Sequence, residues 1–279
     1  MVAGLRKCIM KTARKDDSHK GENGRLLVIC GSKDFPGAAY LASAASIASL
    51  RTGTDIVTVA APEKVAWSIN SINPDIITVK LKGDFLGTAN KSELLREIER
   101  HDVILLGPGV SDKGDTQELV EDLITLKKPK VLDADALKMV DLNRLNNSIL
   151  TPHMGELVKI LENSQLIFKP GSDDFDELKK YVGSNVIVLK GKKDLIITRN
   201  TIIENETGNP GMTVGGTGDV LSGVCAGLLT QGFEPVDAAY YGAKIIGKIG
   251  DGLKEKYGYG FIASDFLSLI AENVKDELG

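Results

Sequence analysis

The sequence predicts an α/β protein whose central sheet is mostly parallel and covered by helices on both faces, with an antiparallel hairpin at one side. From about Arg25 onward, short apolar runs alternate with segments of helical periodicity. The apolar runs are continuous rather than alternating with polar residues, which is typical of parallel strands buried on both faces. Two further β-type runs are separated only by Arg199-Asn200, which predicts the hairpin, although this turn lacks a favourable Gly.

The elements are expected in the following order along the chain. The predicted strands are Leu26–Cys30, Asp55–Ala61, Ile76–Leu81, Val103–Leu106, Lys130–Leu132, Ser148–Leu150, Val186–Leu189, Leu195–Thr198 and Thr201–Glu204. The predicted helices are Ala38–Arg51, Glu63–Ser71, Lys91–Arg100, Thr116–Leu126, Asp173–Tyr181, Thr217–Gln231, Val236–Tyr257 and Ser264–Glu277. Pro36 lies near the start of the first helix and Gly53 suits its C-terminal end. No repeat, low-complexity tract or linker interrupts the pattern, so residues 1–279 are expected to form one domain.

Charge and composition exclude several classes of partner. The net charge is −4, which predicts no basic surface for nucleic acid or for an anionic membrane. No apolar run reaches the roughly 18 residues of a membrane span, and Met1–Lys20 lacks the apolar core of a signal peptide. The three cysteines are widely spaced, which argues against zinc and disulfides. A cytoplasmic protein is therefore expected, with Cys30 and Cys225 buried as small apolar residues.

Several polar residues stand where predicted strands end. The following residues each come a few positions after the last apolar residue of a predicted strand: Gly107-Pro108-Gly109, Asp133, Asp135, His153 and Lys190. The carboxyl ends of parallel strands lie at one edge of the sheet, where α/β proteins bind their ligands. We therefore expect the chemistry of this protein at that edge.

The strongest chemical signal is the segment Gly215-Gly216-Thr217-Gly218-Asp219, which opens a helix of small residues. Glycines allow the backbone to approach a ligand closely, and the first turn of a helix presents unpaired N–H groups to an anion. Asp219 in that turn can accept the proton of a substrate hydroxyl as it attacks a phosphoryl group. The alternative is a tightly packed helix start in which Asp219 complements the dipole. The segment is not a Walker motif, because no Lys-Ser/Thr pair follows the glycines.

The chain resembles the ribokinase-like superfamily, and the NAD(P)HX dehydratase family in particular, over nearly its whole length. The family's motifs follow in its order as His19-Lys20-Gly21, Gly31-Ser32 with Pro36-Gly37-Ala38-Ala39, Gly107-Pro108-Gly109, Asp133–Leu137, Leu150–Glu156, Val188–Gly191 and Asn209–Gly232. Thr213-Val214 is a conservative departure from an Ala-Thr-like pair. The epimerase domain often fused upstream in the family is not present in this sequence, so epimerisation of the substrate is not expected.

The resemblance implies a ribokinase-like three-layer sandwich and a repair reaction. NADH or NADPH hydrated at the nicotinamide ring, in its S-form (NADHX or NADPHX), would be phosphorylated on the new hydroxyl and would then lose phosphate. ADP, less favourably ATP, would be the phosphoryl donor and would leave as AMP or ADP, with Mg²⁺ bound through phosphates and water rather than directly by side chains. Asp219 would be the catalytic base. Relatives also lead us to expect a homo-oligomer such as a tetramer.

The family's binding residues carry over by position. The dinucleotide is expected at Ala38, Gly109, His153 and Asp219. The adenosine nucleotide is expected at Lys190, Gly191, Lys192, Lys193, Asp194 and Gly218, with Gly216, Thr217 and Gly218 forming an anion hole. Without the resemblance, Lys190–Asp194 would be interpreted as a charged turn between strands, and His153 as a surface or structural histidine.

Other residues leave two interpretations open. Asp133 and Asp135 either arrange Mg²⁺ through water or cap the following helix. Glu156 is either another indirect partner of Mg²⁺ or part of an exposed first turn, and the latter is slightly favoured. His101 is expected at a solvated helix end, and His19 is left unassigned.

Two rival functions are compatible with the sequence. The first is a kinase of the same superfamily acting on a vitamin precursor, such as a hydroxymethylpyrimidine or hydroxyethylthiazole, which would leave a stable phosphoester. The second is a non-catalytic nucleotide-binding regulator, which would bind ADP without turnover. The presence of Asp219, His153 and Lys190 together argues against the regulator.

Overall fold

The computed structural model describes residues 14–34, 37–166 and 175–279 and contains one nine-stranded sheet with the order β3-β2-β1-β4-β5-β6-β7-β8-β9. The strands are β1 Arg25–Ile29, β2 Ile56–Pro62, β3 Ile77–Leu81, β4 Val103–Leu106, β5 Lys130–Leu132, β6 Ser148–Leu150, β7 Val186–Leu189, β8 Asp194–Ile197 and β9 Ile202–Asn205. The pairs from β3 to β7 are parallel, and β8 and β9 add antiparallel strands at one edge. The predicted mostly parallel sheet with a lateral hairpin is confirmed.

Helices cover both faces of this sheet. The α-helices are α1 Ala38–Arg51, α2 Glu63–Ile72, α3 Lys91–Glu99, α4 Thr116–Ile124, α5 Met154–Asn163, α6 Lys179–Val182, α7 Thr217–Thr230, α8 Pro235–Tyr257, α9 Ala263–Leu267 and α10 Ile270–Leu278. Short 3₁₀ segments are η1 Thr88–Asn90, η2 Ala134–Met139, η3 Leu142–Arg144, η4 Asp176–Leu178 and η5 Pro210–Thr213. None of the described helices is both long and apolar enough to cross a membrane.

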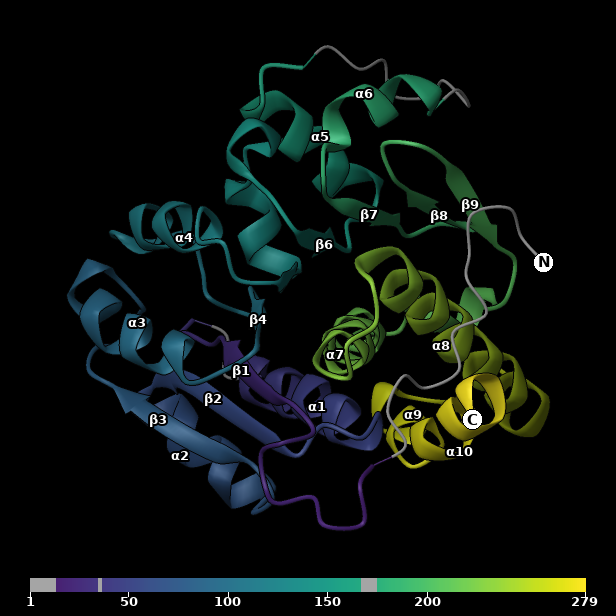
Figure 1. Cartoon of the computed structure of the whole chain (residues 1–279), viewed down its shortest axis with the longest axis horizontal. Helices are drawn as coiled ribbons and strands as arrows, with labels where there is room; N and C mark the ends of the chain where they lie inside the picture. The colour runs from purple at the N-terminus through teal and green to yellow at the C-terminus, as the bar shows by residue number, and fades with distance from the viewer. Residues whose placement is uncertain (1–13, 35–36, 167–174) are drawn as a thin grey trace.

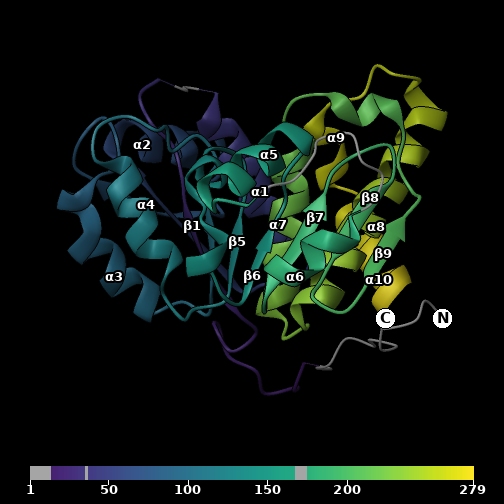
Figure 2. The same cartoon turned by 90° about the horizontal axis from the view of Figure 1, so that it is seen from above.

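The three layers can be followed in Figures 1 and 2, with the sheet between two groups of helices. One hydrophobic cluster joins a sheet face to α1, α2, α7, α8, α9 and α10, and the other joins the opposite face to α3, α4, α5 and α6. Alternate residues of β1 enter the two clusters, because successive strand side chains point to opposite faces: Leu26 and Val28 lie in the first and Leu27 and Ile29 in the second. Continuous apolar strands therefore follow from burial on both faces.

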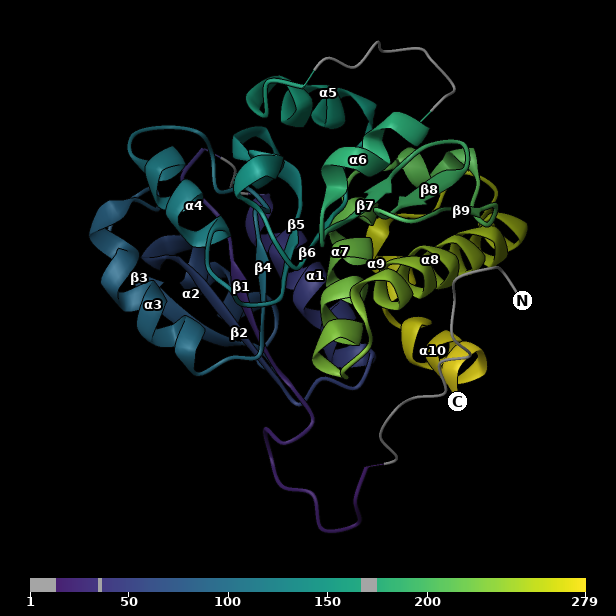
Figure 3. The ribbon, with the colours of Figure 1, turned by 45° about the horizontal axis from the view of Figure 1, so that its top comes forward.

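Helix α7 occupies the middle of its layer, between α1 and α8 (Figures 1 and 3). Its small residues permit a close crossing with α1. A Cβ at Gly223 would lie 2.2 Å from the carbonyl oxygen of Ala45, and one at Gly227 would lie 2.1 Å from the Thr52 hydroxyl. Any larger residue would push the two helices apart. This packing fixes the first turn of α7, and with it Asp219, relative to the sheet.

One helix was missed and two expectations about individual residues or elements were wrong. Helix α5 was not predicted, although its buried Leu157, Ile160 and Leu161 have helical spacing. The predicted helix 264–277 is two helices, because the Leu269 amide donates to the Phe266 carbonyl in a tight 3₁₀-type turn. His101 is buried rather than solvated, and its ring nitrogens bond the Glu97 carbonyl at 2.6 Å and the Thr58 hydroxyl at 2.9 Å.

Other expectations hold or lie outside the described part of the chain. Cys30 and Cys225 are buried and unpaired, as predicted, and burial raises the pKa of both thiols well above its usual range. Pro36 and the first two residues of the predicted helix 173–181 lie outside the described residues.

Candidate active site

The loops that leave β4, β5, β6 and β7 converge at the carboxyl edge of the sheet. The Ser111 amide, in the loop after β4, donates to Asp135 after β5 at 3.1 Å. The Lys190 amide, after β7, donates to the Pro152 carbonyl, after β6, at 2.8 Å, and His153 and Lys190 form an isolated parallel bridge. The structure therefore brings Asp133, Asp135, His153 and Lys190 to one edge, as the strand pattern predicted.

The first turn of α7 lies against the same edge. Gly216 has φ 97°, a left-handed conformation that glycine adopts readily, and it directly precedes α7. The Thr217 hydroxyl lies 2.7 Å from the Met212 carbonyl oxygen and 3.1 Å from that of Val214, and its hydrogen bonding holds the loop against the helix. The first amides of an α-helix have no intrahelical acceptor. The turn from Thr217 onward is therefore a positive pole to which an anion can bind.

Lys190 brings a charge to this pole. A Cβ on Gly218 would lie 3.3 Å from Lys190 Nζ, so the ammonium group lies directly beside the first turn of α7. Two carboxylates face the same ammonium, with Asp133 Oδ1 at 3.4 Å and Glu156 Oε2 at 3.9 Å. Burial alone lowers the pKa of Lys190, but the negative charges of Asp133 and Glu156 more than offset it and raise the pKa. Lys190 is therefore a permanent cation at the helix start.

Asp219 is half-buried in the same turn. Burial and the negative charge of Asp133 raise the pKa of its carboxyl from 3.8 to about 7, against the opposing effect of Lys190. A carboxylate with a pKa near neutrality can both accept a proton and release it, as a general base must. The pKa and the position of Asp219 are therefore suited to proton transfer beside a bound phosphoryl group.

His153 begins helix α5 through a reciprocal pair of hydrogen bonds. Its backbone amide donates to Glu156 Oε2 at 2.9 Å, and Glu156 N donates to His153 Nδ1 at 3.2 Å. Because Nδ1 accepts, the neutral ring carries its proton on Nε2. The side chain is 62 % exposed, whereas that of Glu156 is 13 % exposed. The imidazole can therefore reach a ligand. The expectation that Glu156 is exposed was wrong, because its carboxylate faces Lys190 and the start of α5.

Asp133 and Asp135 have distinct partners. Asp133 accepts from the Thr151 hydroxyl at 2.8 Å and from Lys190, and Asp135 accepts from the Ser111 amide and from Lys138 at 2.6 Å. Neither side chain caps η2, the helix that follows. Among the described residues, no group of three or more His, Cys, Asp or Glu side chains is arranged to hold a metal ion. The sequence missed Thr151 and Ser111, whose only signal was a polar residue just beyond a strand.

The loop from Lys190 to Asp194 divides its residues between the site and the hairpin. Asp194 accepts from the Gly191 amide at 3.2 Å and from Asn205 at 3.2 Å, and burial raises the pKa of its carboxyl. Lys193 pairs across the hairpin with Glu204 at 2.9 Å and with Glu206 at 2.6 Å. Lys192 is exposed. The structure thus places Lys190 at the α7 start, while Lys193 lies against hairpin carboxylates.

Two predicted contact residues lie farther along the same rim. Ala38 is the first residue of α1. The Leu41 side chain of the same helix lies so close to Gly216 that a Cβ added at Gly216 would be 2.6 Å from it. Gly109 has φ 65° and lies in the loop after β4, beyond Gly107. Ala38 therefore lies on a helix that borders the α7 start, whereas Gly109 lies in the loop whose Ser111 amide bonds Asp135.

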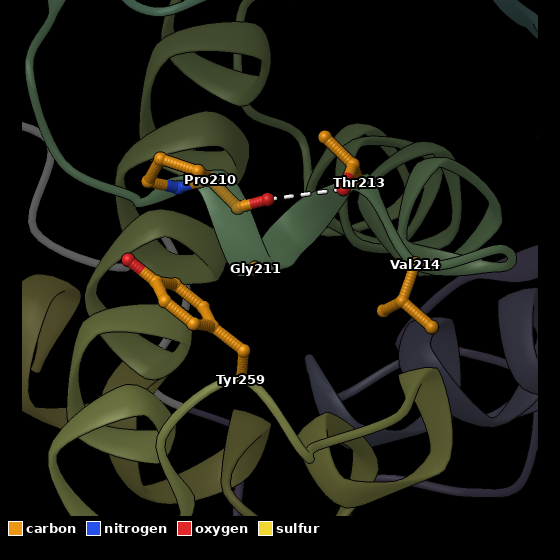
Figure 4. A pocket seen from close by; sticks show the side chains of 5 residues that line it. All are labelled: Pro210, Gly211, Thr213, Val214 and Tyr259. Atoms are coloured by element: carbon orange, nitrogen blue, oxygen red, sulfur yellow. Dashed lines mark hydrogen bonds between the residues drawn. The ribbon is translucent and has the colours of Figure 1, made fainter.

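An open groove of about 540 Å³ lies beside the glycine loop and is lined by Pro210, Gly211, Thr213, Val214 and Tyr259 (Figure 4). The Thr213 hydroxyl donates to the Pro210 carbonyl at 3.0 Å, which closes η5 at the rim of the groove. The lining contains none of Asp133, Lys190 and Asp219. The groove therefore adjoins the candidate site without containing its charged groups.

Comparison with known proteins places the chain in one family. A family model described as NAD(P)H-hydrate dehydratase matches residues 26–272. The ADP-dependent (S)-NAD(P)H-hydrate dehydratase of Nitrosopumilus maritimus is 34% identical over 268 residues, which cover 94% of this chain and 92% of that protein. The bifunctional NAD(P)H-hydrate repair enzyme of Methanothermobacter thermautotrophicus is 39% identical over 268 residues, or 92% of this chain. That match covers 51% of the relative, so the chain spans about half the length of the bifunctional relatives.

A solved structure shares the whole fold. The ADP/ATP-dependent NAD(P)H-hydrate dehydratase of Bacillus subtilis, co-crystallised with ATP and Mg²⁺, superimposes with a TM-score of 0.75 at 26% identity. The superposition covers 95% of this chain and 94% of that chain. The ribokinase of Thermotoga maritima has the same fold at lower similarity, with a TM-score of 0.56 at 14% identity over 91% of this chain and 99% of that chain, which confirms the ribokinase-like fold implied by the sequence motifs. With a family model spanning residues 26–272 and a relative matched over 92% of its own length, the chain belongs to the NAD(P)H-hydrate dehydratase family.

Proposed function

We propose that this protein dehydrates the S-form of hydrated NADH or NADPH at the expense of ADP, with ATP as the less favoured donor. The observation that carries the proposal is the position of Lys190 Nζ beside Gly218 at the start of α7, one residue from Asp219. A cation and unpaired helix amides there attract a phosphoryl group, and Asp219 supplies a base next to it. Binding of the dinucleotide at Ala38, Gly109 and His153, and of the nucleotide along Lys190–Asp194 and Gly218, belongs to the same proposal.

The chemistry runs in two steps. Asp219 accepts the proton of the ring hydroxyl while the hydroxyl oxygen attacks the terminal phosphorus of ADP. A new O–P bond forms and AMP leaves. The anion hole of Gly216, Thr217 and Gly218, with Lys190, stabilises the charge on the phosphoryl oxygens. The lone pair of the ring nitrogen then expels phosphate as the C–O bond breaks, and loss of a proton from the adjacent ring carbon restores the double bond. The products are the reduced cofactor, AMP and phosphate.

Mg²⁺ belongs to the proposal as an ion held by the nucleotide phosphates and water. Asp219 is assigned to proton transfer, and the nearby carboxylates Asp133 and Glu156 already face Lys190, which leaves the phosphates as the main oxygen donors for the ion. When bound there it would neutralise phosphate charge. We further propose that residues 1–279 act as one domain in the cytoplasm. We also propose that the protein is a homo-oligomer such as a tetramer, and analytical ultracentrifugation would test this oligomeric state.

The test of function is absorbance at 340 nm. Purified protein, Mg²⁺ and hydrated NADH are mixed, and ADP or ATP is added in separate cuvettes. A rise that requires nucleotide supports regeneration of the reduced cofactor, and the faster donor identifies the preferred nucleotide. No rise from folded protein would overturn the proposal, and a stable phosphoester on a small alcohol would then indicate a vitamin-precursor kinase.

The pH dependence should report the protonation of Asp219. Because burial and Asp133 raise its pKa to about 7, the reactive carboxylate is lost as the pH falls through neutrality. We expect kcat/KM to fall about tenfold per pH unit below that point and to level off above it. Rates are measured from pH 5.5 to 8.5, with enzyme-free blanks for spontaneous loss of the substrate. A flat profile over this range would contradict the assignment of Asp219 as the base.

Replacing His153 by Ala should weaken dinucleotide binding about tenfold and leave ADP affinity unchanged, because the exposed imidazole is expected to contact only the dinucleotide. Calorimetric titration with each ligand measures both affinities. His153 also accepts the Glu156 amide hydrogen bond, so His153→Asn is the matched control, because Asn caps a helix but lacks the ring. If His153→Ala instead weakened ADP binding and left dinucleotide binding unchanged, the assignment of the two subsites would have to be exchanged.

A further inference from the structure

The ammonium group of Lys190 lies in a place where the helix dipole of α7 repels it. Its Nζ is beside the first turn of α7, whose amides already form the positive end of a helix dipole. A lysine side chain is long and flexible, and an unrestrained ammonium would move toward water. In this structure the Lys190 side chain is only 25% exposed. Other groups must therefore hold it against the helix.

The group best placed to do so is Asp133. Its side chain is 3% exposed, and its Oδ1 lies 3.4 Å from Lys190 Nζ. The same oxygen accepts a hydrogen bond of 2.8 Å from the hydroxyl of Thr151, which is itself buried at the end of β6. Glu156 approaches Lys190 from another element, but at 3.9 Å and with its carboxylate engaged by the His153 amide. Asp133 thus has both the shorter contact and the more rigid support.

From this geometry we propose that Asp133, fixed by the Thr151 hydroxyl, is a positioning residue that holds Lys190 at the start of α7 to receive the terminal phosphoryl group of the nucleotide. Asp133 acts through Lys190 and does not touch the nucleotide itself. A buried carboxylate offsets the cost of placing a cation beside a positive helix end, and the phosphate then binds a preformed site. The inference rests on the proposed function insofar as a nucleotide occupies this place.

A double-mutant cycle tests the proposal. ADP affinity is measured by calorimetry for the wild type, Asp133→Asn, Lys190→Met and the double variant. Asp133→Asn should weaken ADP binding about tenfold in the wild type and less than about twofold when Lys190 is Met, because the positioned group is then gone. Equal losses in both backgrounds would overturn the proposal, since a merely structural carboxylate would act independently of Lys190. Asp141→Asn, which changes a carboxylate bonded to Asn143, is the control and should bind ADP normally.

A second variant covers the case in which Asp133→Asn does not fold, as judged by its thermal unfolding. Thr151→Val removes the hydroxyl hydrogen bond but leaves the charges of Asp133 and Lys190 in place. It should weaken ADP binding about threefold when Lys190 is present and should have no effect in the Lys190→Met background. Unchanged ADP affinity in Thr151→Val would count against positioning. These titrations need no hydrated cofactor. If the 340 nm assay fails but the effects of the Asp133 and Lys190 variants on ADP affinity are coupled, only the proposed function is wrong. If the assay succeeds but the two variants weaken ADP binding independently, only this inference is wrong.

Discussion

Asp219→Asn should lower turnover about 100-fold or more while ADP binding survives. The amide has the size of the carboxylate but cannot accept the hydroxyl proton, so the loss falls on kcat rather than on nucleotide affinity. Turnover is followed at 340 nm and ADP affinity by calorimetry, with Asp141→Asn as the control carboxylate. Full activity in Asp219→Asn would remove Asp219 from the mechanism, and loss of ADP binding would make it a binding residue.

The same variant has a consequence for stability that is independent of the reaction. The pKa of Asp219 is raised to about 7 in the folded protein, so folding favours its protonated form. That contribution is fully present below pH 3.8, the ordinary value, and is lost as the pH rises through about 7, where ionisation costs up to about 4 kcal/mol. Asp219→Asn should therefore raise the melting temperature at pH 8 and do so much less at pH 5. An equal melting temperature at pH 8 would show that the carboxylate ionises there at little cost.

The sheet was predictable because its signal is local. A strand buried on both faces is mainly apolar at successive positions, and β4 and residues 26–29 of β1 satisfy that condition in sequence as they do in space. Helix α5 was missed for a local reason too, since Gly155 follows its first residue and weakens the helical pattern, whereas its start depends on the His153–Glu156 hydrogen bonds. Such a capping pair involving His is difficult to recognise before the chain is folded.

The site was predictable in its parts but not in its connections. Strand ends predicted the edge at which Asp133, His153 and Lys190 lie, because parallel topology brings such residues together. The expected roles of His153 and Lys190 came from the family resemblance. Which carboxylate faces which cation depends on side-chain packing between β5, β6 and β7, and no periodicity encodes it. Lys193 illustrates the difference, because its position in the motif placed it with the nucleotide, whereas its charge in the structure faces Glu204 and Glu206 on the hairpin.

Gly107→Ala should destabilise the protein by about 3 kcal/mol or more, with loss of activity in whatever fraction still folds. Gly107 has φ 136°, and a Cβ there would lie 1.8 Å from the backbone carbonyl of Asp133 and 2.9 Å from Ala136. A backbone carbonyl cannot swing aside as a side chain can, so the segment after β5 must move away from the loop after β4. That shift would displace Asp133 and, with it, the contact that holds Lys190.

Gly114→Ala separates this steric cost from the cost of a positive φ. Gly114 has φ 64°, and a Cβ added there would meet no atom within 4 Å, so its replacement should cost only about 1 kcal/mol. Urea denaturation of both variants gives the two free energies of unfolding on one scale. If Gly107→Ala lost no more stability than Gly114→Ala, the loop after β4 would be free to move away from β5. Asp133 would then not be held rigidly in the site, and the proposal that it positions Lys190 would be wrong.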